Sequence, residues 1–136
     1  MGMYTEVNLG LSFKDNTPDE VIKILKCLLS EEEWVQDLPE HNFFKCDRFK
    51  FVLISNSYYF DSITDSKMEL DNIDGKYHLN VRSNLKNYNS EIQNFIDYIS
   101  PYIDTEGFIG YMRYEEDDDP TLIYCNDGNI RYKKVE

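Results

Sequence analysis

In several parts of this chain, short segments in which apolar and polar residues alternate are separated by tight turns. Such alternation is typical of strands that bury one face. Asp74-Gly75, placed between two alternating segments, is a strong hairpin signal. Parallel strands need a long crossover connection, which a tight turn cannot supply. The pattern therefore predicts hairpins and, with them, an antiparallel sheet.

The expected strands form three groups along the chain. In the first group, Val7, Leu9 and Leu11 alternate with polar residues. The β-rich runs that open the second group are separated at Ser55-Asn56-Ser57, which reads as a bulge or a turn. We predict strands over residues 3–13, 49–54, 58–60, 68–70, 77–81, 108–115, 121–125 and 130–133.

Two segments carry the signals of longer helices. Thr17-Pro18-Asp19-Glu20 combines a capping hydroxyl, a proline at the first helical position and an acid at the third. With the apolar face that follows, it predicts a helix over residues 18–29. Residues 90–93 offer a similar capping box, and the apolar spacing over 92–99 predicts a second helix that Pro101 ends.

A shorter helix is expected after the first long one. Ser30-Glu31-Glu32-Glu33 repeats the capping pattern and places three acids where the helix dipole favours negative charge. This helix would hold Trp34 and Val35, and Leu38-Pro39 would end it.

The order of these elements indicates the fold class. Strands follow one another in runs instead of alternating singly with helices, which favours an α+β fold over a doubly wound parallel one. We expect a mainly antiparallel sheet of about six or seven strands, with the two main helices on one face. A length of 136 residues without a Pro/Gly-rich break indicates a single domain over residues 1–136.

The charge balance narrows the range of partners. Fourteen Lys and Arg stand against 26 Asp and Glu, which gives a formal net charge of −12. This excess of acid disfavours direct binding to nucleic acid or to an anionic membrane, and it favours a basic protein partner. Cys27, Cys46 and Cys125 form no C-x-x-C pair and are typical of reduced thiols. With no leader and no membrane-spanning run, we expect a cytoplasmic protein.

Motifs that hold cofactors or metals are missing from the sequence. It contains no dinucleotide or nucleotide phosphate loop and no G-x-S-x-G motif, so we expect no cofactor and no metal site. The two histidines are His41 and His78. His41 could pair with Cys46 as a nucleophile, but a cysteine among phenylalanines is more typical of a small buried hydrophobe. His78 is expected on the polar face of a strand, and no catalytic residue is assigned.

The acidic run after Tyr114 is a distinctive charged motif. Its successive carboxylates repel one another unless a cation or a basic surface neutralises them. They could dock Lys and Arg side chains, form a solvated hairpin loop, or hold calcium weakly, although the glycine and glutamate of an EF-hand are missing. The run consists of Glu115, Glu116, Asp117, Asp118 and Asp119.

Aromatic residues add a second feature, since the chain has eleven Tyr, eight Phe and one Trp. Tyrosine offers a large contact area at little entropic cost, so tyrosines among acids suit an interface with a basic protein. Strands also select aromatic residues for the core, so both uses stay open.

Tyr111-Met112-Arg113-Tyr114-Glu115-Glu116 and the acids that follow combine both features. A small acidic α+β chain of this kind resembles bacterial immunity proteins and phage-borne inhibitors. The resemblance implies a non-enzymatic protein that blocks a basic partner, such as a nuclease or another nucleic-acid-binding enzyme, with carboxylates standing in for phosphates. The residues expected to contact the partner are Tyr111, Tyr114, Glu31, Glu32, Glu33, Glu115, Glu116, Asp117, Asp118 and Asp119, with both groups of acids on one face.

Two other functions remain open from the sequence. A small hydrolase or metal-dependent enzyme with a carboxylate site would require a pocket in which carboxyl groups have raised pKa values. A homo-oligomeric structural or regulatory subunit would use an exposed sheet edge or an aromatic patch.

Overall fold

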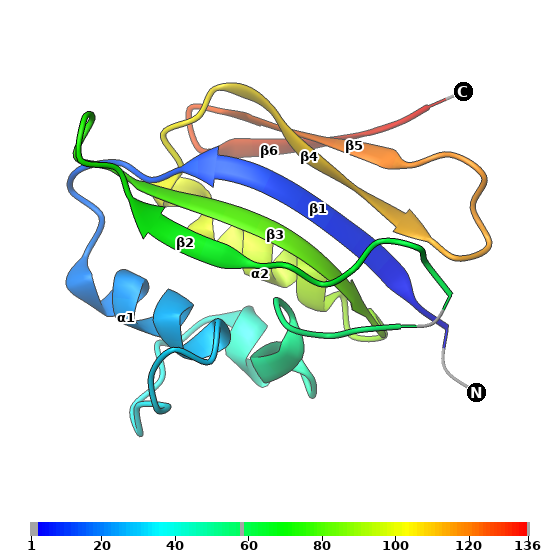
Figure 1. Ribbon diagram of the computed structural model, residues 1–136, viewed down its shortest axis with the longest axis horizontal. Coiled ribbons are helices and arrows are strands. Elements are labelled where there is room, and N and C mark those ends of the chain that lie inside the picture. Colours follow the sequence, from blue (N-terminus) through cyan, green and yellow to red (C-terminus); the bar gives the residue numbers. More distant parts are fainter. Residues whose placement is uncertain (1–2, 58, 136) are drawn as a thin grey trace.

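Six antiparallel strands form one sheet in the computed structural model, which describes residues 3–57 and 59–135. The strand order across the sheet is β2-β3-β1-β4-β5-β6 (Figure 1). In chain order, the elements are β1 (Thr5–Ser12), α1 (Asp19–Leu28), η1 (Asn42–Lys45), η2 (Phe49–Phe51), β2 (Lys67–Leu70), β3 (Tyr77–Leu85), α2 (Glu91–Ile99), η3 (Ser100–Tyr102), β4 (Gly107–Tyr114), β5 (Thr121–Asn126) and β6 (Asn129–Lys134).

The first strand of the chain lies inside the sheet. Along β1, Thr5 pairs with Leu85 of β3 on one side and with Tyr114 of β4 on the other. Val7 and Leu9 are almost fully buried, as the alternation along the sequence predicts. Because β1 has a strand on each side, its alternating residues define the two faces of the sheet.

Both long helices lie on the same side of the sheet (Figure 1). Leu25 and Leu28 of α1, and Phe95 and Ile96 of α2, are buried in the same core as the odd-numbered residues of β1. The spacing of apolar residues in each helix predicts these buried faces. The expected α+β fold, with an antiparallel sheet and two helices on one face, is confirmed.

The opposite side of the sheet, here called the open face, carries the even-numbered residues of β1 and their cross-strand neighbours. A strap, formed by the described residues of 55–66, crosses this face near the start of β1 (Figure 1). Asn84 Nδ2 donates a hydrogen bond to the Ser62 carbonyl oxygen over 2.9 Å, and the Arg113 guanidinium carbon lies 5.2 Å from the centre of the Phe60 ring. These contacts hold the strap against one end of the open face.

Residues 49–54 do not form the expected strand. They begin with η2 and then turn, so the successive residues Val52 and Leu53 are both buried. Phe49 packs edge to face against Phe43, with 5.7 Å between the ring centroids. A short apolar run in which successive residues are buried has no period that separates a strand from a helix.

The strand expected at 58–60 is wrong over its described residues. Tyr59 and Phe60 adopt a bend within the strap, and residue 58 lies outside the described residues. The Tyr59 hydroxyl donates to the Glu115 carbonyl oxygen over 2.8 Å. Phe60 packs over the sheet beside Arg113 of β4 instead of joining it.

The short helix expected around Trp34 and Val35 does not form, because both residues lie in an irregular connection. Ser30 has a φ of +62°, and the Glu31 N–H donates to the Lys26 carbonyl oxygen over 2.9 Å. A left-handed residue with such a back-bond is typical of a helix C-terminus. Ser30 therefore ends α1 instead of beginning another helix.

Both long helices begin without the capping boxes that the sequence predicts. The Thr17 hydroxyl donates to the Lys14 carbonyl oxygen over 2.7 Å and caps nothing in α1. Ser90 makes no side-chain capping bond either; Asn87 Oδ1 accepts from the Ile92 N–H over 2.8 Å in its place. The two helices are confirmed, while the residues that start them differ from the expected ones.

None of the helices in the described part of the chain has the length and apolar content that a bilayer crossing requires.

Candidate binding groove

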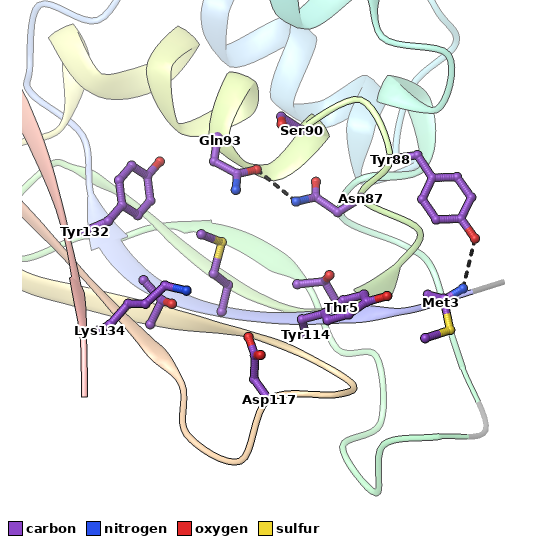
Figure 2. A pocket seen from close by; sticks show the side chains of 12 residues that line it. Met3, Thr5, Asn87, Tyr88, Ser90, Gln93, Tyr114, Asp117, Tyr132 and Lys134 are labelled. Carbon is purple, nitrogen blue, oxygen red and sulfur yellow. Dashed lines mark hydrogen bonds between the residues drawn. The ribbon is translucent and has the colours of Figure 1, made fainter. Parts of the chain in front are cut away.

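A hollow of about 530 Å³ lies between the start of α2 and strands β1, β4, β5 and β6. Figure 2 shows Gln93 reaching from α2 toward the sheet, with Tyr132 and Lys134 extending from β6 on the other side. Hollows of roughly 300–1,000 Å³ are large enough for a small molecule or for several peptide side chains. The lining of this groove consists of Met3, Thr5, Asn87, Tyr88, Ser90, Gln93, Met112, Tyr114, Asp117, Thr121, Tyr132 and Lys134.

Asn87 holds the start of α2 at the groove. Its Oδ1 accepts from the Ile92 N–H, and its Nδ2 donates to Gln93 Oε1 over 2.9 Å (Figure 2). Ser90 lies between these contacts with a φ of +57°, a left-handed conformation that is unfavourable for a residue with a Cβ. The chain therefore turns sharply into the helix, and Ser90 and Gln93 both become part of the lining.

The far end of the groove is closed by Tyr88. The Met3 N–H donates to the Tyr88 hydroxyl over 2.9 Å (Figure 2). The guanidinium carbon of Arg48 lies 5.4 Å from the centre of the Tyr88 ring, a cation–π contact. These two contacts fix an otherwise exposed ring at the end of the groove.

Two tyrosines in the groove have raised pKa values. Burial raises the pKa of Tyr114, and the carboxylates of Glu116 and Glu115 raise it further. Partial burial raises the pKa of Tyr132 to about 12, and the Asp97 carboxylate adds to this effect. Carboxylates that oppose the ionisation of a phenol also attract a cation to the same place.

The acidic loop, residues 115–119, joins β4 to β5, and Asp117 brings it to the groove (Figure 2). The Glu115 N–H donates to the Tyr4 carbonyl oxygen over 3.0 Å, and the Asp117 N–H donates to the Tyr114 carbonyl oxygen over 2.9 Å. The loop acids after Glu115 are exposed, and they line a second hollow of about 310 Å³ beside the groove. The Glu115 carboxylate also accepts from the Tyr4 N–H, so the base of the loop is fixed while the carboxylates of residues 116–119 face solvent.

The structure separates the residues that the sequence predicts for partner binding. Tyr114 and the acidic loop meet at the groove, whereas Tyr111 pairs with Asn8 in the register and lies on the open face. Residues 31–33 follow α1 at the other end of the molecule from the acidic loop (Figure 1). The hydrogen bond from Lys23 lowers the pKa of Glu32. The two groups of acids therefore do not meet at one site.

Most of the groove has no signal in the sequence. Asn87 and Gln93 precede and begin α2, while Met112, Thr121 and Lys134 come from three different strands. Each of these residue types is common in helices, strands or loops, so none indicates a binding site. The one available signal was composition, because Tyr132 belongs to the tyrosines that are mixed among charged residues in this chain.

The charged side chains that line the groove in the described part of the chain are Asp117 and Lys134. Among the described residues that line it, Asp117 is the carboxylate, and neither histidine nor cysteine is present. His41 lies elsewhere, with its Nε2 3.0 Å from Asp97 Oδ2. Cys46 is buried as expected, and burial raises the pKa of its thiol.

Three potential metal ligands meet at the turn between β2 and β3. One ligand atom each from Asp71, Asp74 and His78 lies within 4.8 Å of the others. His78 Nε2 is 2.9 Å from Asp74 Oδ2, and the Lys76 N–H donates to Asp74 Oδ1 over 2.8 Å. The Lys76 N–H and then His78 lower the pKa of Asp74. These bonds within the turn account for the cluster, which the sequence analysis did not expect.

With the fold and the groove described, the chain can be set beside known proteins. No family model matches it, and neither a curated protein nor a solved structure matches it. The geometry of the groove and of the acidic loop therefore carries the functional conclusion.

Proposed function

We propose that the protein is a non-enzymatic binding protein that holds a cationic segment of a partner protein in the groove and against the acidic loop, and so blocks that partner. The position of Asp117 carries this proposal, because it places the acidic loop at the mouth of a groove that three tyrosines line, with Glu116, Asp118 and Asp119 in the adjoining hollow. The resemblance to immunity and inhibitor proteins supports the same function. A nuclease or another nucleic-acid-binding enzyme exposes Arg and Lys of the kind that this site suits.

A Lys or Arg side chain fits both parts of the site. Its apolar stem can lie against Met112 and the ring of Tyr114, while its charged head reaches the loop carboxylates. The loop also steers a cationic partner, because opposite charges speed association. Lys134, the cation among the described lining residues, repels a second cation and so favours entry from the side of Asp117.

The proposal is tested with a fluorescein-labelled arginine-rich peptide and fluorescence anisotropy. The triple variant Asp117→Asn, Asp118→Asn, Asp119→Asn should bind the peptide about tenfold more weakly than the wild type. Raising sodium chloride from about 20 to about 200 mM should weaken the wild-type complex far more than the variant complex, because the loop charges are exposed.

The matched control is the triple variant Glu31→Gln, Glu32→Gln, Glu33→Gln, which removes the same charge away from the groove. Its affinity for the peptide should stay within about twofold of the wild type, since exposed charges beyond a Debye length are screened. Equal weakening by both triple variants would show that total charge, not the groove, attracts the peptide, and the proposal would then be wrong.

A further inference from the structure

Gly10 lies inside β1, although nothing in the described chain requires a glycine there. Its φ is not in the left-handed range, and a Cβ built on it would meet no atom within 4 Å. An interior glycine destabilises a strand by roughly 0.5–1 kcal/mol relative to alanine. A glycine that the fold does not need points to another molecule that approaches the backbone at this position.

Gly110 shows the contrasting case of a glycine that the fold does need. Its φ is +152°, and a Cβ on it would lie 1.9 Å from the Asn8 carbonyl oxygen. It follows directly on a shift in the register between β4 and β5 that begins at Phe108. The close approach of its own neighbouring strand explains Gly110, and no such contact explains Gly10.

Gly10 opens onto a shallow hollow of about 300 Å³ on the open face. Lys67 and Glu69 of β2 and His78 and Asn80 of β3 line this hollow. Gly10 pairs with Asn80, and Asn80 pairs with Lys67, so the three lie in one row across the sheet. The hollow therefore leads from the backbone of β1 to a cation at the β2 edge.

On β4, β5 and β6, the open face carries rings and cations. Phe108 is 52% exposed and packs edge to face against Tyr124, with 5.7 Å between the ring centroids. The guanidinium carbon of Arg131 lies 4.4 Å from the centre of the Tyr124 ring. Lys133 pairs with Leu122 on the same face. Exposed aromatic residues with a stacked arginine are enriched at the centres of protein interfaces.

We propose that the open face docks a partner-protein segment that has an apolar middle and carboxylates toward its ends. Arg131 and Lys133 provide cations at the β6 edge, and Lys67 and Arg82 provide them toward β2. Gly10 and the rings on β4 and β5 lie between these edges. Lys67 Nζ lies 3.9 Å from Glu69 Oε1 on the same strand, and this glutamate offsets the charge of Lys67. The β6 edge therefore attracts carboxylates more strongly than the β2 edge does. This proposal concerns a different face from the groove and does not depend on it.

Two other occupants fit the charges less well. A second copy of the chain, laid face to face, brings Arg131 and Lys133 toward the same cations, while the exposed carboxylate Glu69 is already shared with Lys67. Nucleic acid carries negative charge, but a protein with a net charge of −12 repels it as a whole. An acidic protein segment meets the local cations without a polyanion's charge density.

The test uses a fluorescein-labelled peptide with acidic residues at both ends and Leu and Phe in the middle, followed by anisotropy and by amide NMR shifts. Gly10→Val fills the hollow and should weaken binding about tenfold, while the urea midpoint stays the same or rises because valine favours strands. The double variant Arg131→Ala, Lys133→Ala should weaken binding by a similar factor. Lys26→Ala with Lys45→Ala, an equal charge change away from the open face, should stay within about twofold of the wild type.

The expected result is loss of binding in Gly10→Val with the fold intact, and amide shifts confined to the open face. Unchanged affinity in Gly10→Val, or unfolding of that variant, would show that this glycine does not report a docked partner, and would overturn the proposal. A uridine oligonucleotide that binds more tightly than the peptide would assign the face to nucleic acid. A dimer seen by sedimentation that Gly10→Val disrupts would assign it to a second copy.

Discussion

Gly110 and Gly10 lie on neighbouring strands and differ in the space available for a Cβ atom. Gly110→Ala forces a Cβ into the Asn8 carbonyl and should lower the free energy of unfolding by about 2–4 kcal/mol. Gly10→Ala meets no atom and should change it by less than about 1 kcal/mol, with a gain as the favoured sign. Urea unfolding of both variants measures the difference. Equal losses would mean that strand propensity, not close approach, governs both positions.

Tyr132 provides a titration that can be followed by absorbance. Its folded pKa is raised to about 12, above the ordinary phenol value of 10.0, so the folded state binds the proton more tightly than the unfolded state does. Any stability from the protonated phenol is therefore complete below pH 10.0 and is lost as the pH rises through about 12.

The difference in phenolate absorbance between the wild type and Tyr132→Phe should consequently have its midpoint near pH 12. Repeating the difference in urea serves as the control, since unfolding should return the midpoint to about 10. A folded-state midpoint near the ordinary value would show that Tyr132 is neither buried nor near the Asp97 carboxylate.

For single residues, the sequence predicted burial or exposure better than it predicted specific contacts. Cys46 was expected to be a small buried hydrophobe and is buried. His78 was expected on a polar strand face and lies exposed beside Asp74. The contact from Asn87 to Gln93 had no signal, because an asparagine before a helix is common whether or not it caps that helix.

At the scale of elements, α2 depends on Asn87 and not on Ser90. Asn87→Ala removes the acceptor for the Ile92 N–H and should cost about 1 kcal/mol. Ser90→Gly should instead stabilise the protein by about 1 kcal/mol, because glycine adopts a positive φ without strain. Urea midpoints with unchanged m-values would check both. The opposite order of effects would show that Ser90 caps the helix in solution.

Elements with a clear period were predicted well. The two amphipathic helices and the Asp74-Gly75 hairpin follow local rules of spacing and turn chemistry, and all three form. Residues 49–54 failed because aromatic packing against Phe43 decided their conformation. Residues 30–33 failed because the same serine-and-acid pattern can follow the end of one helix as well as begin another.

For the whole molecule, self-repulsion is a testable contribution to stability. A net charge of −12 opposes compaction, and salt screens charges that lie more than a Debye length apart. The melting temperature should therefore rise by a few degrees when sodium chloride is raised from about 10 to about 200 mM.

The variant with Asp117, Asp118 and Asp119 changed to Asn should show a smaller rise than the wild type, because three of the repelling charges are gone. Potassium chloride should give the same rise as sodium chloride if the effect is screening. A melting temperature that falls with salt would mean that ion pairs such as Lys76 with Asp104 outweigh the repulsion.

The groove could not be predicted from the sequence, because its lining residues are far apart along the chain. Its lining comes from β1, α2, β4, β5, β6 and the loops beside them, so no segment contains its pattern. The sequence predicted that Tyr114 and Asp117 contact a partner, because Asp117 belongs to the acidic run and Tyr114 directly precedes it. It could not show that residues 31–33 lie at the other end of the molecule, since that separation depends on tertiary packing.

The position of β1 also affects how the protein is made. This strand leaves the ribosome before the strands that pair with it, which are complete only after residues 85 and 114 have emerged. Until then, Val7 and Leu9 stay uncovered on a strand with two vacant edges, a state prone to aggregation and open to chaperones. Synthesis must therefore reach residue 114 before β1 is protected on both edges, and β5 and β6 then extend a sheet whose middle already exists.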